Sequence, residues 1–467
     1  MSAAPPPPSA AATGDGTPAA DAPAAASTVA GSGGSPPYPA PPAAHTRTAD
    51  ELAAAGIVEV PRTCMCAVAV AAGKRGWRVR GIDFEVDARY SLLRVLGTGS
   101  YGVVVAAWDA VTGVVVAIKR VARIFDDAVE ARRILREIRL MRSLRHDALL
   151  GLIDVDVPAL ETWDAWHNVY LVSLQMDRDL HRVLRSPVPL TDAHCRFFAW
   201  QLLAGVKYMH SANVLHRDLK PANLLVNEDC SLRICDFGLA RYVGEGSVDV
   251  QGAVSPLTQY VSTRWFRAPE LVLCRDAYST AVDMWSVGAI LADLLGRRPL
   301  FPGRDFRHQI STIVSVLGTP AEDDIAHVTS PTARAFLASL PATAPIPLRN
   351  LLPGAPEDAL DLLSRLLCFN PTTRLSATEA LDHPYVASFH EPALEGVAGD
   401  DVLAGGPLEP PAGDLPPSVL RGLMWREVLA FHPDAVGVAV AAGAPGGGKH
   451  EAQWVSESES PRSSMPV

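Results

Sequence analysis

The segment HRDLKPAN occupies residues 216–223 and brings together three side chains of complementary chemistry. Asp218 supplies a carboxylate, Lys220 an ammonium two positions later, and Asn223 an amide five positions after the carboxylate. Phosphoryl transfer uses these residue types: the Asp accepts the proton of the attacking hydroxyl, the Lys screens the transferring group, and the Asn binds Mg²⁺. Because the run matches H-R-D-L-x-x-x-N at five fixed positions, we expect a phosphoryl-transfer centre here rather than an ordinary loop.

The residues that follow predict a hairpin. Two short apolar runs, LLV at 224–226 and LRI at 232–234, flank the turn-like NEDCS at 227–231. The point between Asp229 and Cys230 is equidistant from Asn223 and from Asp236, the first residue of a DFG tripeptide. Antiparallel pairing would therefore bring Asn223 and Asp236 together as two oxygen ligands for Mg²⁺, whose shell substrate phosphates would complete.

Upstream, LGTGSYGVV at 96–104 has the spacing G-x-G-x-x-G-x-V between two strand-like segments. Glycines at these positions let backbone amides approach phosphate oxygens without obstruction by a Cβ atom. An ordinary hairpin turn explains the glycine triplet equally well. A dinucleotide-binding site is disfavoured, because a strand and not a helix follows the last glycine.

The run VVVAIKR at 114–120 predicts a strand in which Ala117 and Lys119 share one face. A small residue beside a lysine suits an adenine ring lying over the alanine while the ammonium reaches a phosphate. The alternative is an edge-strand lysine in solvent. The chain has only five lysines among its 41 basic residues, so a lysine within a motif indicates a need for a compact ammonium.

A helix is expected at 131–144, with Ile134 and Ile138 on its apolar face and Glu137 close to that face. A carboxylate at the boundary of a core needs a partner. We infer an ion pair between Glu137 and Lys119, which would orient the lysine on ATP. A surface pair with a neighbouring arginine is the alternative.

Bulk properties limit the classes of function. The net charge of −10 argues against a nucleic-acid-binding surface as the main function and favours basic partners. Seven cysteines at irregular spacing do not form a disulfide framework, so we expect a reducing compartment, the cytoplasm, with the nucleus as an alternative. No apolar run has the length of a membrane span.

The composition divides the chain into tails and two folded parts, an α+β arrangement. Strand-like runs with one helix precede a larger region of mainly helical periodicity. The expected organisation is a disordered Ala/Pro-rich extension at 1–75, a small mainly β lobe at 84–176, a larger mainly α lobe at 177–388, a C-terminal extension at 389–433 and a disordered tail at 434–467.

The glycine loop, VAIK, HRDLKPAN, DFG and APE at 268–270 occur in the order found in eukaryotic protein kinases, and the chain resembles that family from about residue 80 to residue 433. HRDLKPAN resembles the serine/threonine kinases. The resemblance implies a bilobal fold with ATP and Mg²⁺ between the lobes, a hinge at 173–177, and a small gatekeeper at Ser173 that leaves the back of the adenine pocket open. The ATP-binding residues that it implies are Leu96, Gly97, Thr98, Gly99, Ser100, Tyr101, Gly102, Val104, Ala117, Lys119, Ser173 and Met176.

The sequence Thr258-Gln259-Tyr260, between DFG and APE, resembles the T-x-Y activation lip of mitogen-activated protein kinases. The insert beginning LGTPAEDD and the C-terminal LMWREVLAFHP, which in that family returns to the small lobe, resemble it as well. The resemblance implies activation by phosphorylation of Thr258 and Tyr260, with an upstream dual-specificity kinase and phosphatases as partners. The arginines implied are Arg136, Arg217 and Arg241 for phospho-Thr258, and Arg264 and Arg267 for phospho-Tyr260.

Arg264 and Arg267 would also shape the pocket for the residue after the phosphoacceptor, so Ser-Pro and Thr-Pro substrates are expected. Three features depart from the family pattern. Phe266 replaces a usual tyrosine, the stretch before Thr258 is longer and glycine-rich, and the docking acids are reduced to Glu391 and Glu395. A scaffold that uses the kinase fold to bind partners, with incidental activity, is the alternative function.

Overall fold

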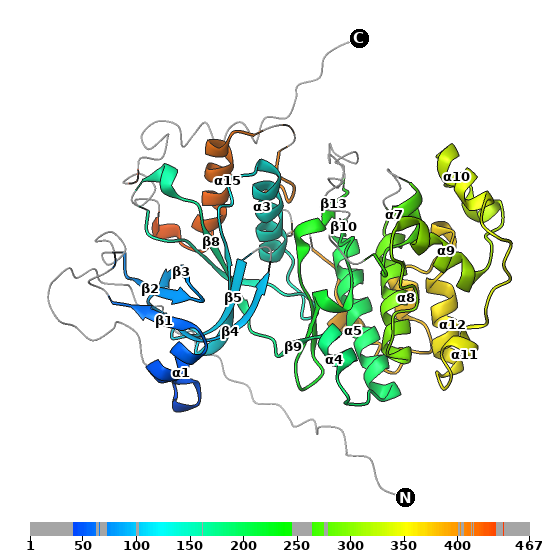
Figure 1. The fold of residues 1–467 in the computed structure, drawn as a ribbon, viewed down its shortest axis with the longest axis horizontal. Helices are drawn as coiled ribbons and strands as arrows, with labels where there is room; N and C mark the ends of the chain where they lie inside the picture. Colours follow the sequence, from blue (N-terminus) through cyan, green and yellow to red (C-terminus); the bar gives the residue numbers. More distant parts are fainter. Residues whose placement is uncertain are drawn as a thin grey trace, which may run out of the picture. The chain divides into compact units, whose positions relative to one another are not determined.

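A computed structural model describes the following residues: 41–61, 65, 72–99, 102–160, 162–244, 264–274, 279–399, 402, 406–411, 413, 415–435 and 442. The first part of the chain is mainly β and the later part mainly α, as Figure 1 shows. The change occurs between strand β8 (Val169–Leu174) and helix α4 (Leu180–Arg185), so the α+β prediction is confirmed.

A five-stranded antiparallel sheet forms the frame of the small lobe, in the order β4-β5-β6-β8-β7. Alternating valines explain it, because Val116 and Ile118 turn to one face and are completely buried, while Ala117 and Lys119 turn to the other. Besides β8, its strands are β4 (Tyr90–Gly99), β5 (Gly102–Asp109), β6 (Val114–Val121) and β7 (Leu152–Asp156).

Helix α3 (Ala128–Ser143) covers part of this sheet and starts at Asp127, whose side chain accepts the N–H of Val129. Ile134 and Ile138 point into a cluster shared with residues of β7 and β8. The predicted apolar face of this helix is therefore confirmed.

A second sheet of three antiparallel strands precedes the first: β1 (Ile57–Val60), β2 (Lys74–Val79) and β3 (Ile82–Asp87). Helix α1 (Ala49–Ala54) leads into it, with a capping box between Thr48 and Glu51. Ile57 is fully buried among residues of both sheets. The expectation of disorder up to residue 75 therefore does not hold for these residues, because the Ala/Pro composition that motivated it ends before the capping box.

The large lobe packs around α5 (Asp192–Ser211) and α8 (Ala281–Gly296). Most residues of α8 are buried, as expected for a helix that is apolar all round. The other helices are α7 (Pro269–Leu273), α9 (Phe306–Leu317), α10 (Pro331–Ala338), α11 (Leu348–Leu351), α12 (Glu357–Leu366), α13 (Ala377–Leu381) and α14 (Pro392–Glu395). The short strands are β9 (Arg178–Asp179), β10 (Val214–Leu215), β11 (Leu224–Val226), β12 (Leu232–Ile234) and β13 (Arg241–Tyr242). None of the described helices is both long and apolar enough to span a bilayer.

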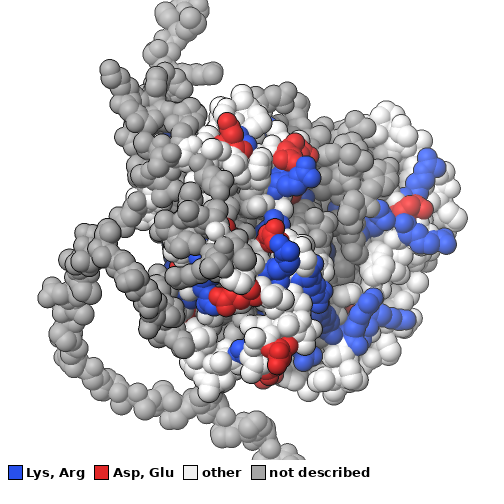
Figure 2. Space-filling view, turned by 60° about the vertical axis from the view of Figure 1, so that its left-hand side comes forward, with Lys and Arg blue, Asp and Glu red and all other residues white. Residues whose placement is uncertain are grey.

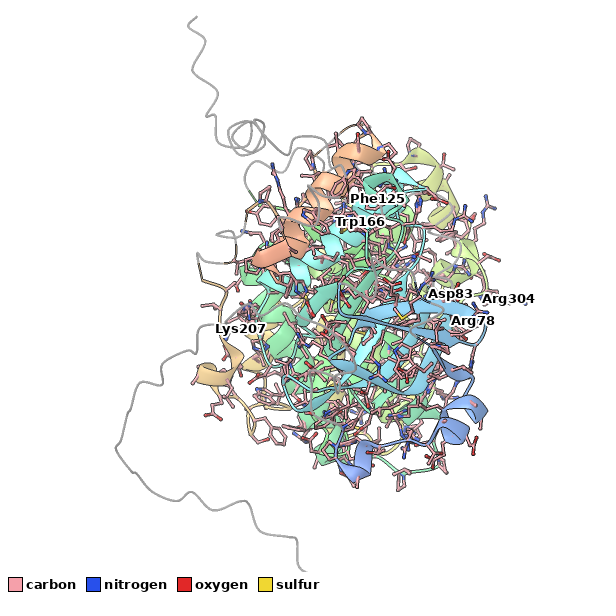
Figure 3. The ribbon with its side chains drawn as sticks, turned by 90° about the vertical axis from the view of Figure 1, so that its left-hand side faces the viewer. Arg78, Asp83, Phe125, Trp166, Lys207 and Arg304 are labelled. Atoms are coloured by element: carbon pink, nitrogen blue, oxygen red, sulfur yellow. The ribbon has the colours of Figure 1, made fainter. Side chains whose placement is uncertain are left out.

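Helix α15 (Pro417–Leu429) returns to the small lobe and lies beside α3, as seen at the top of Figure 1. Trp425 packs edge-on against Trp163 and Trp166, with ring centroids 5.8 and 5.5 Å away. Figure 3 labels Trp166 and Phe125 next to this orange helix. The backbone N–H of Trp163 donates to the carbonyl of Ala442 at 2.7 Å. Ala442 lies within the tail for which disorder was expected.

Candidate active site

The predicted ion pair between β6 and α3 is present. The Nζ of Lys119 lies 2.7 Å from Oε1 of Glu137, whose side chain is 5% exposed. Burial alone would lower the pKa of Lys119, but the negative charges of Glu137 and Asp236 outweigh it and raise that pKa. The lysine is therefore held as a fully charged ammonium beside Asp236.

The HRDLKPAN segment folds so that its three polar side chains meet. Nζ of Lys220 lies 2.5 Å from Oδ2 of Asp218, and Nδ2 of Asn223 donates to the same Oδ2 at 3.3 Å and to the carbonyl oxygen of Asp218 at 3.0 Å. Asp218 is 7% exposed. A carboxylate held in one position by two donors can accept a proton from a hydroxyl placed beside it.

Asp283, on α8, fixes the backbone of this segment. Its fully buried carboxylate accepts the N–H groups of His216 at 2.9 Å and Arg217 at 2.8 Å, and lies 3.0 Å from Nε2 of His210. Burial would raise the pKa of Asp283, but the hydrogen bond and charge of His210 outweigh it and lower that pKa. These contacts stabilise Arg217 at φ 68°, an unfavourable backbone angle for a residue with a Cβ.

Sequence reasoning missed Asp283. The available signal was an acidic residue near the start of an otherwise apolar helical run, VDMWSVGAILADLL, since a buried carboxylate requires hydrogen-bond donors.

The hairpin predicted after Asn223 is present, with one difference in register. Strands β11 and β12 pair antiparallel with Leu224 opposite Ile234, so Asn223 lies opposite Cys235 and not opposite Asp236. The N–H of Cys235 donates to the carbonyl of Asn223 at 2.9 Å. Asp236 follows at once in the left-handed region, at φ 65°.

Asn223 and Asp236 offer an amide oxygen and a carboxylate, the hard ligands that Mg²⁺ prefers. No group of three or more His, Cys, Asp or Glu side chains that could hold a metal occurs among the described residues. An ion held by Asn223 and Asp236 would take the rest of its shell from substrate phosphates and water. The residues present therefore suit Mg²⁺.

Most residues of the expected ATP site can be placed. Leu96, Gly97, Thr98, Gly99, Gly102 and Val104 lie on the β4–β5 hairpin, whereas Ser100 and Tyr101 lie outside the described residues. Gly102 has φ 129°, and a Cβ there would be 2.0 Å from the carbonyl oxygen of Arg120, so only glycine fits. The hairpin that was the alternative explanation of the glycines is present, and its strands carry the residues expected to approach the phosphates.

The residues expected around adenine lie on two adjacent strands and directly after one of them. Ala117 on β6 pairs with Ser173 on β8, and Ser173 is 9% exposed. Met176, which follows β8, is 8% exposed. The three residues therefore lie around the end of β8, where the chain leaves the small lobe.

The phosphate-binding roles of the five predicted arginines stay predictions. Thr258 and Tyr260 lie outside the described residues. Arg136, expected to bind phospho-Thr258, places its Nε 2.8 Å from Oε2 of Glu409. Arg217 is 8% exposed, and Arg241 lies on β13, which pairs with β10.

The two arginines expected at phospho-Tyr260 flank Phe266 in sequence, and Phe266 is buried. Arg264 donates from Nη1 to the carbonyl of Arg304 at 3.1 Å, and Arg267 is 9% exposed. The carbonyl of Phe266 accepts the hydroxyl of Ser286 at 2.8 Å.

The expectation that Glu395 is a surface docking acid is wrong. Its side chain is fully buried, and its carboxylate accepts from Trp200 Nε1 at 3.0 Å and Lys207 Nζ at 3.1 Å. Leu394, in contrast, is 52% exposed. The helical turn of α14 explains the difference, because it turns Glu395 inward against α5.

The face in Figure 2 shows blue and red side chains side by side over much of its described surface. Arg78 and Asp83, labelled in Figure 3, form an exposed ion pair at 2.8 Å. Exposed ion pairs of this kind contribute little to the stability of the fold.

The small lobe is mainly β and carries a glycine hairpin and a lysine–glutamate pair. The helical lobe that follows carries Asp218, Asn223 and Asp236. This combination defines a protein kinase. Residues 90–386 match the protein kinase domain family.

Known proteins define the family more narrowly. The chain is 45% identical over 358 residues to Extracellular signal-regulated kinase 1 of Dictyostelium discoideum, covering 76% of this chain and 65% of that protein. It is 45% identical over 364 residues to Mitogen-activated protein kinase 7 of Arabidopsis thaliana, covering 78% and 95%. It is 48% identical over 324 residues to Mitogen-activated protein kinase mpkA of Aspergillus fumigatus, covering 69% and 75%. The chain belongs to the mitogen-activated protein kinase family of serine/threonine kinases.

Proposed function

We propose that this kinase transfers the γ-phosphate of ATP to serine or threonine hydroxyls of proteins, with Asp218 as the catalytic base. The observation that carries the proposal is the convergence of Lys220 and Asn223 on the Asp218 carboxylate. This arrangement holds a buried carboxylate in a single orientation, next to the loop that carries Asp236.

The residues divide the work. Oδ of Asp218 accepts the hydroxyl proton as the new O–P bond forms and the bond to the β-phosphate oxygen breaks. Lys220 offsets charge on the transferred group, and Lys119, oriented by Glu137, binds the phosphates of ATP. Bound at Asn223 and Asp236, Mg²⁺ would neutralise phosphate charge.

Regulation and substrate choice follow from family membership. We infer activation by an upstream dual-specificity kinase that phosphorylates Thr258 and Tyr260, reversal by phosphatases, and substrates with Ser-Pro or Thr-Pro sites. The buried Phe266 between Arg264 and Arg267 supports a shaped pocket at this segment. We also propose the cytoplasm and the nucleus as sites of action, where free thiols such as buried Cys195 stay reduced.

Turnover tests the catalytic assignment. The purified chain, treated with an upstream kinase, should phosphorylate a Ser-Pro peptide with MgATP, and Asp218→Ala should lower kcat by about 10²–10⁴-fold. A peptide with Ala in place of Pro is the control for substrate choice. Activity that survives Asp218→Ala would contradict the assignment of the base, and absent turnover with intact partner binding would indicate a scaffold.

A further inference from the structure

Glu409, in the segment that leads to α15, joins two parts of the catalytic region that are distant in sequence. Its Oε2 lies 2.8 Å from Nε of Arg136 on α3, and its Oε1 accepts the backbone N–H of Tyr242 at 3.0 Å. The carbonyl of Glu409 also accepts from Nη1 of Arg139 at 3.1 Å, and Arg132 donates to the carbonyl of Pro411.

The two partners of this carboxylate are close in sequence to catalytic groups. Arg136 precedes Glu137, which holds Lys119. Tyr242 lies six positions after Asp236, on the strand that leads away from the expected Mg²⁺ ligand. A carboxylate with a guanidinium on one oxygen and an N–H on the other makes two charge-assisted hydrogen bonds, which are the strong ones. Glu409 therefore connects the position of α3 to that of the segment after DFG.

Arg136 was expected to bind the phosphate on Thr258, and the structure gives it a carboxylate of the same chain. We propose that Glu409 is a positioning residue that supplies an anion to Arg136 in the unphosphorylated kinase, and so keeps Glu137 within reach of Lys119. The inference rests on the proposed function, since it assigns Glu409 a role in that reaction.

Anchoring of the C-terminal segment does not require this contact. Glu427 on α15 already binds Nε of Arg139 at 2.8 Å and Nε of Arg142 at 3.0 Å, and Trp425 packs among indoles. Leu408, next to Glu409, is 2% exposed and lies in the core of the large lobe. The side chain of Glu409 is thus not needed to attach the C-terminal segment, and it can position α3.

The charges on α3 give a second reason for a positioning role of Glu409. Arg132, Arg136 and Arg139 follow one another at spacings of four and three residues, so they lie on one side of α3 and repel each other. A carboxylate among them offsets that repulsion. A phosphate on Thr258 would offer the same chemistry with more charge.

The test compares Glu409→Gln in two states of the full chain. In the phosphatase-treated protein we expect kcat/KM to fall about tenfold with a raised KM for ATP, because α3 is no longer fixed. In protein phosphorylated on Thr258 we expect a loss of less than about twofold, because the phosphate supplies the anion. Glu357→Gln, at an exposed ion pair with Arg349, is the matched control and should change neither state.

Equal loss in both states would show a merely structural role and overturn the inference, as would no loss in either. Arg136→Gln combined with Glu409→Gln should lose no more than Arg136→Gln alone if the two act as a pair. Hydrogen exchange of the amides of residues 128–143 gives a readout that does not need turnover: Glu409→Gln should speed exchange only in the phosphatase-treated state. If the wild-type chain shows no turnover in either state, the proposed function fails, and the exchange measurement still decides the role of Glu409.

Discussion

Arg374 and Glu270 form a two-point ion pair inside the large lobe. Nη1 and Nη2 of Arg374 lie 2.8 and 3.1 Å from the two carboxylate oxygens of Glu270, and the side chains are 0% and 1% exposed. Arg374 also donates to the carbonyls of Ala281 and Cys368. The pair therefore ties the APE segment to the loop before α13.

Loss of one partner should be severe, because it leaves a buried charge without compensation. Arg374→Met is expected to lower the free energy of unfolding by about 3–5 kcal/mol, measured by urea denaturation. The control is Arg349→Met, whose pair with Glu357 is 67% and 74% exposed and should matter by less than about 1 kcal/mol. Similar losses in both variants would contradict the interpretation.

Glu395→Gln should destabilise the fold by about 1–3 kcal/mol, because the buried amide cannot replace a carboxylate that accepts from Trp200 and Lys207. The exposed neighbour Glu391 is the matched control, and Glu391→Gln should unfold like the wild type. Burial would raise the pKa of Glu395, but its hydrogen bonds outweigh this and lower that pKa.

The lowered pKa fixes the direction of the pH effect. Stability from Glu395 is present above the pKa of an unfolded glutamate and is lost as pH falls through the lower folded value. The difference in melting temperature between wild type and Glu395→Gln should therefore shrink on acidification. A difference that grows toward low pH would be inconsistent with a stabilised carboxylate.

Glu137→Gln should lower kcat/KM for ATP by roughly 10²-fold while the melting temperature changes little, because Lys119 loses its orienting partner. Glu130→Gln, on the first turn of the same helix, tests whether any acid-to-amide change on α3 has this effect. Steady-state kinetics at varied MgATP provide the measurement. Equal losses in the two variants would show that the helix, and not the ion pair, was perturbed.

Asp293 on α8 predicts an opposite pH dependence. Asp293 is only 4% exposed, and no hydrogen bond to its carboxylate occurs in the described part of the chain. Burial raises the pKa of Asp293 to about 6. The folded state therefore holds the proton more tightly than the unfolded state, and stability falls as pH rises from about 4 through 6.

Asp293→Asn removes this titration. It should stabilise the protein at pH 7.5 by about 1–3 kcal/mol and by about half as much at pH 5, measured as a shift of the thermal midpoint. If Asp293→Asn lowers the thermal midpoint equally at pH 7.5 and at pH 5, the carboxylate of Asp293 has a stabilising partner.

Much of the site could be predicted because its signals are local. The pairing of Lys119 with Glu137 followed from a strand alternation and a helical face, and the β11–β12 hairpin followed from two apolar runs and a turn. Its register was one residue off, since turn length alone does not fix which residue pairs across it.

The contacts that were not predicted join distant segments. The contact of Arg136 with Glu409 and the burial of Glu395 depend on how the C-terminal extension crosses both lobes, which no local pattern encodes. Asp283 was missed for the same reason, because its partners are backbone amides of a loop about 70 residues away. The helix and strand at 49–60 were missed because composition was averaged over a longer segment.

The packing of Trp425 against Trp163 and Trp166 has a practical meaning for anyone who shortens this protein. A piece ending at residue 386, where the family match stops, would lose α15 and present two indole rings and the guanidinium of Arg139 to solvent. Such a fragment is expected to aggregate even though every catalytic motif is intact. The part that homology recognises is thus smaller than the part that can stand alone in solution.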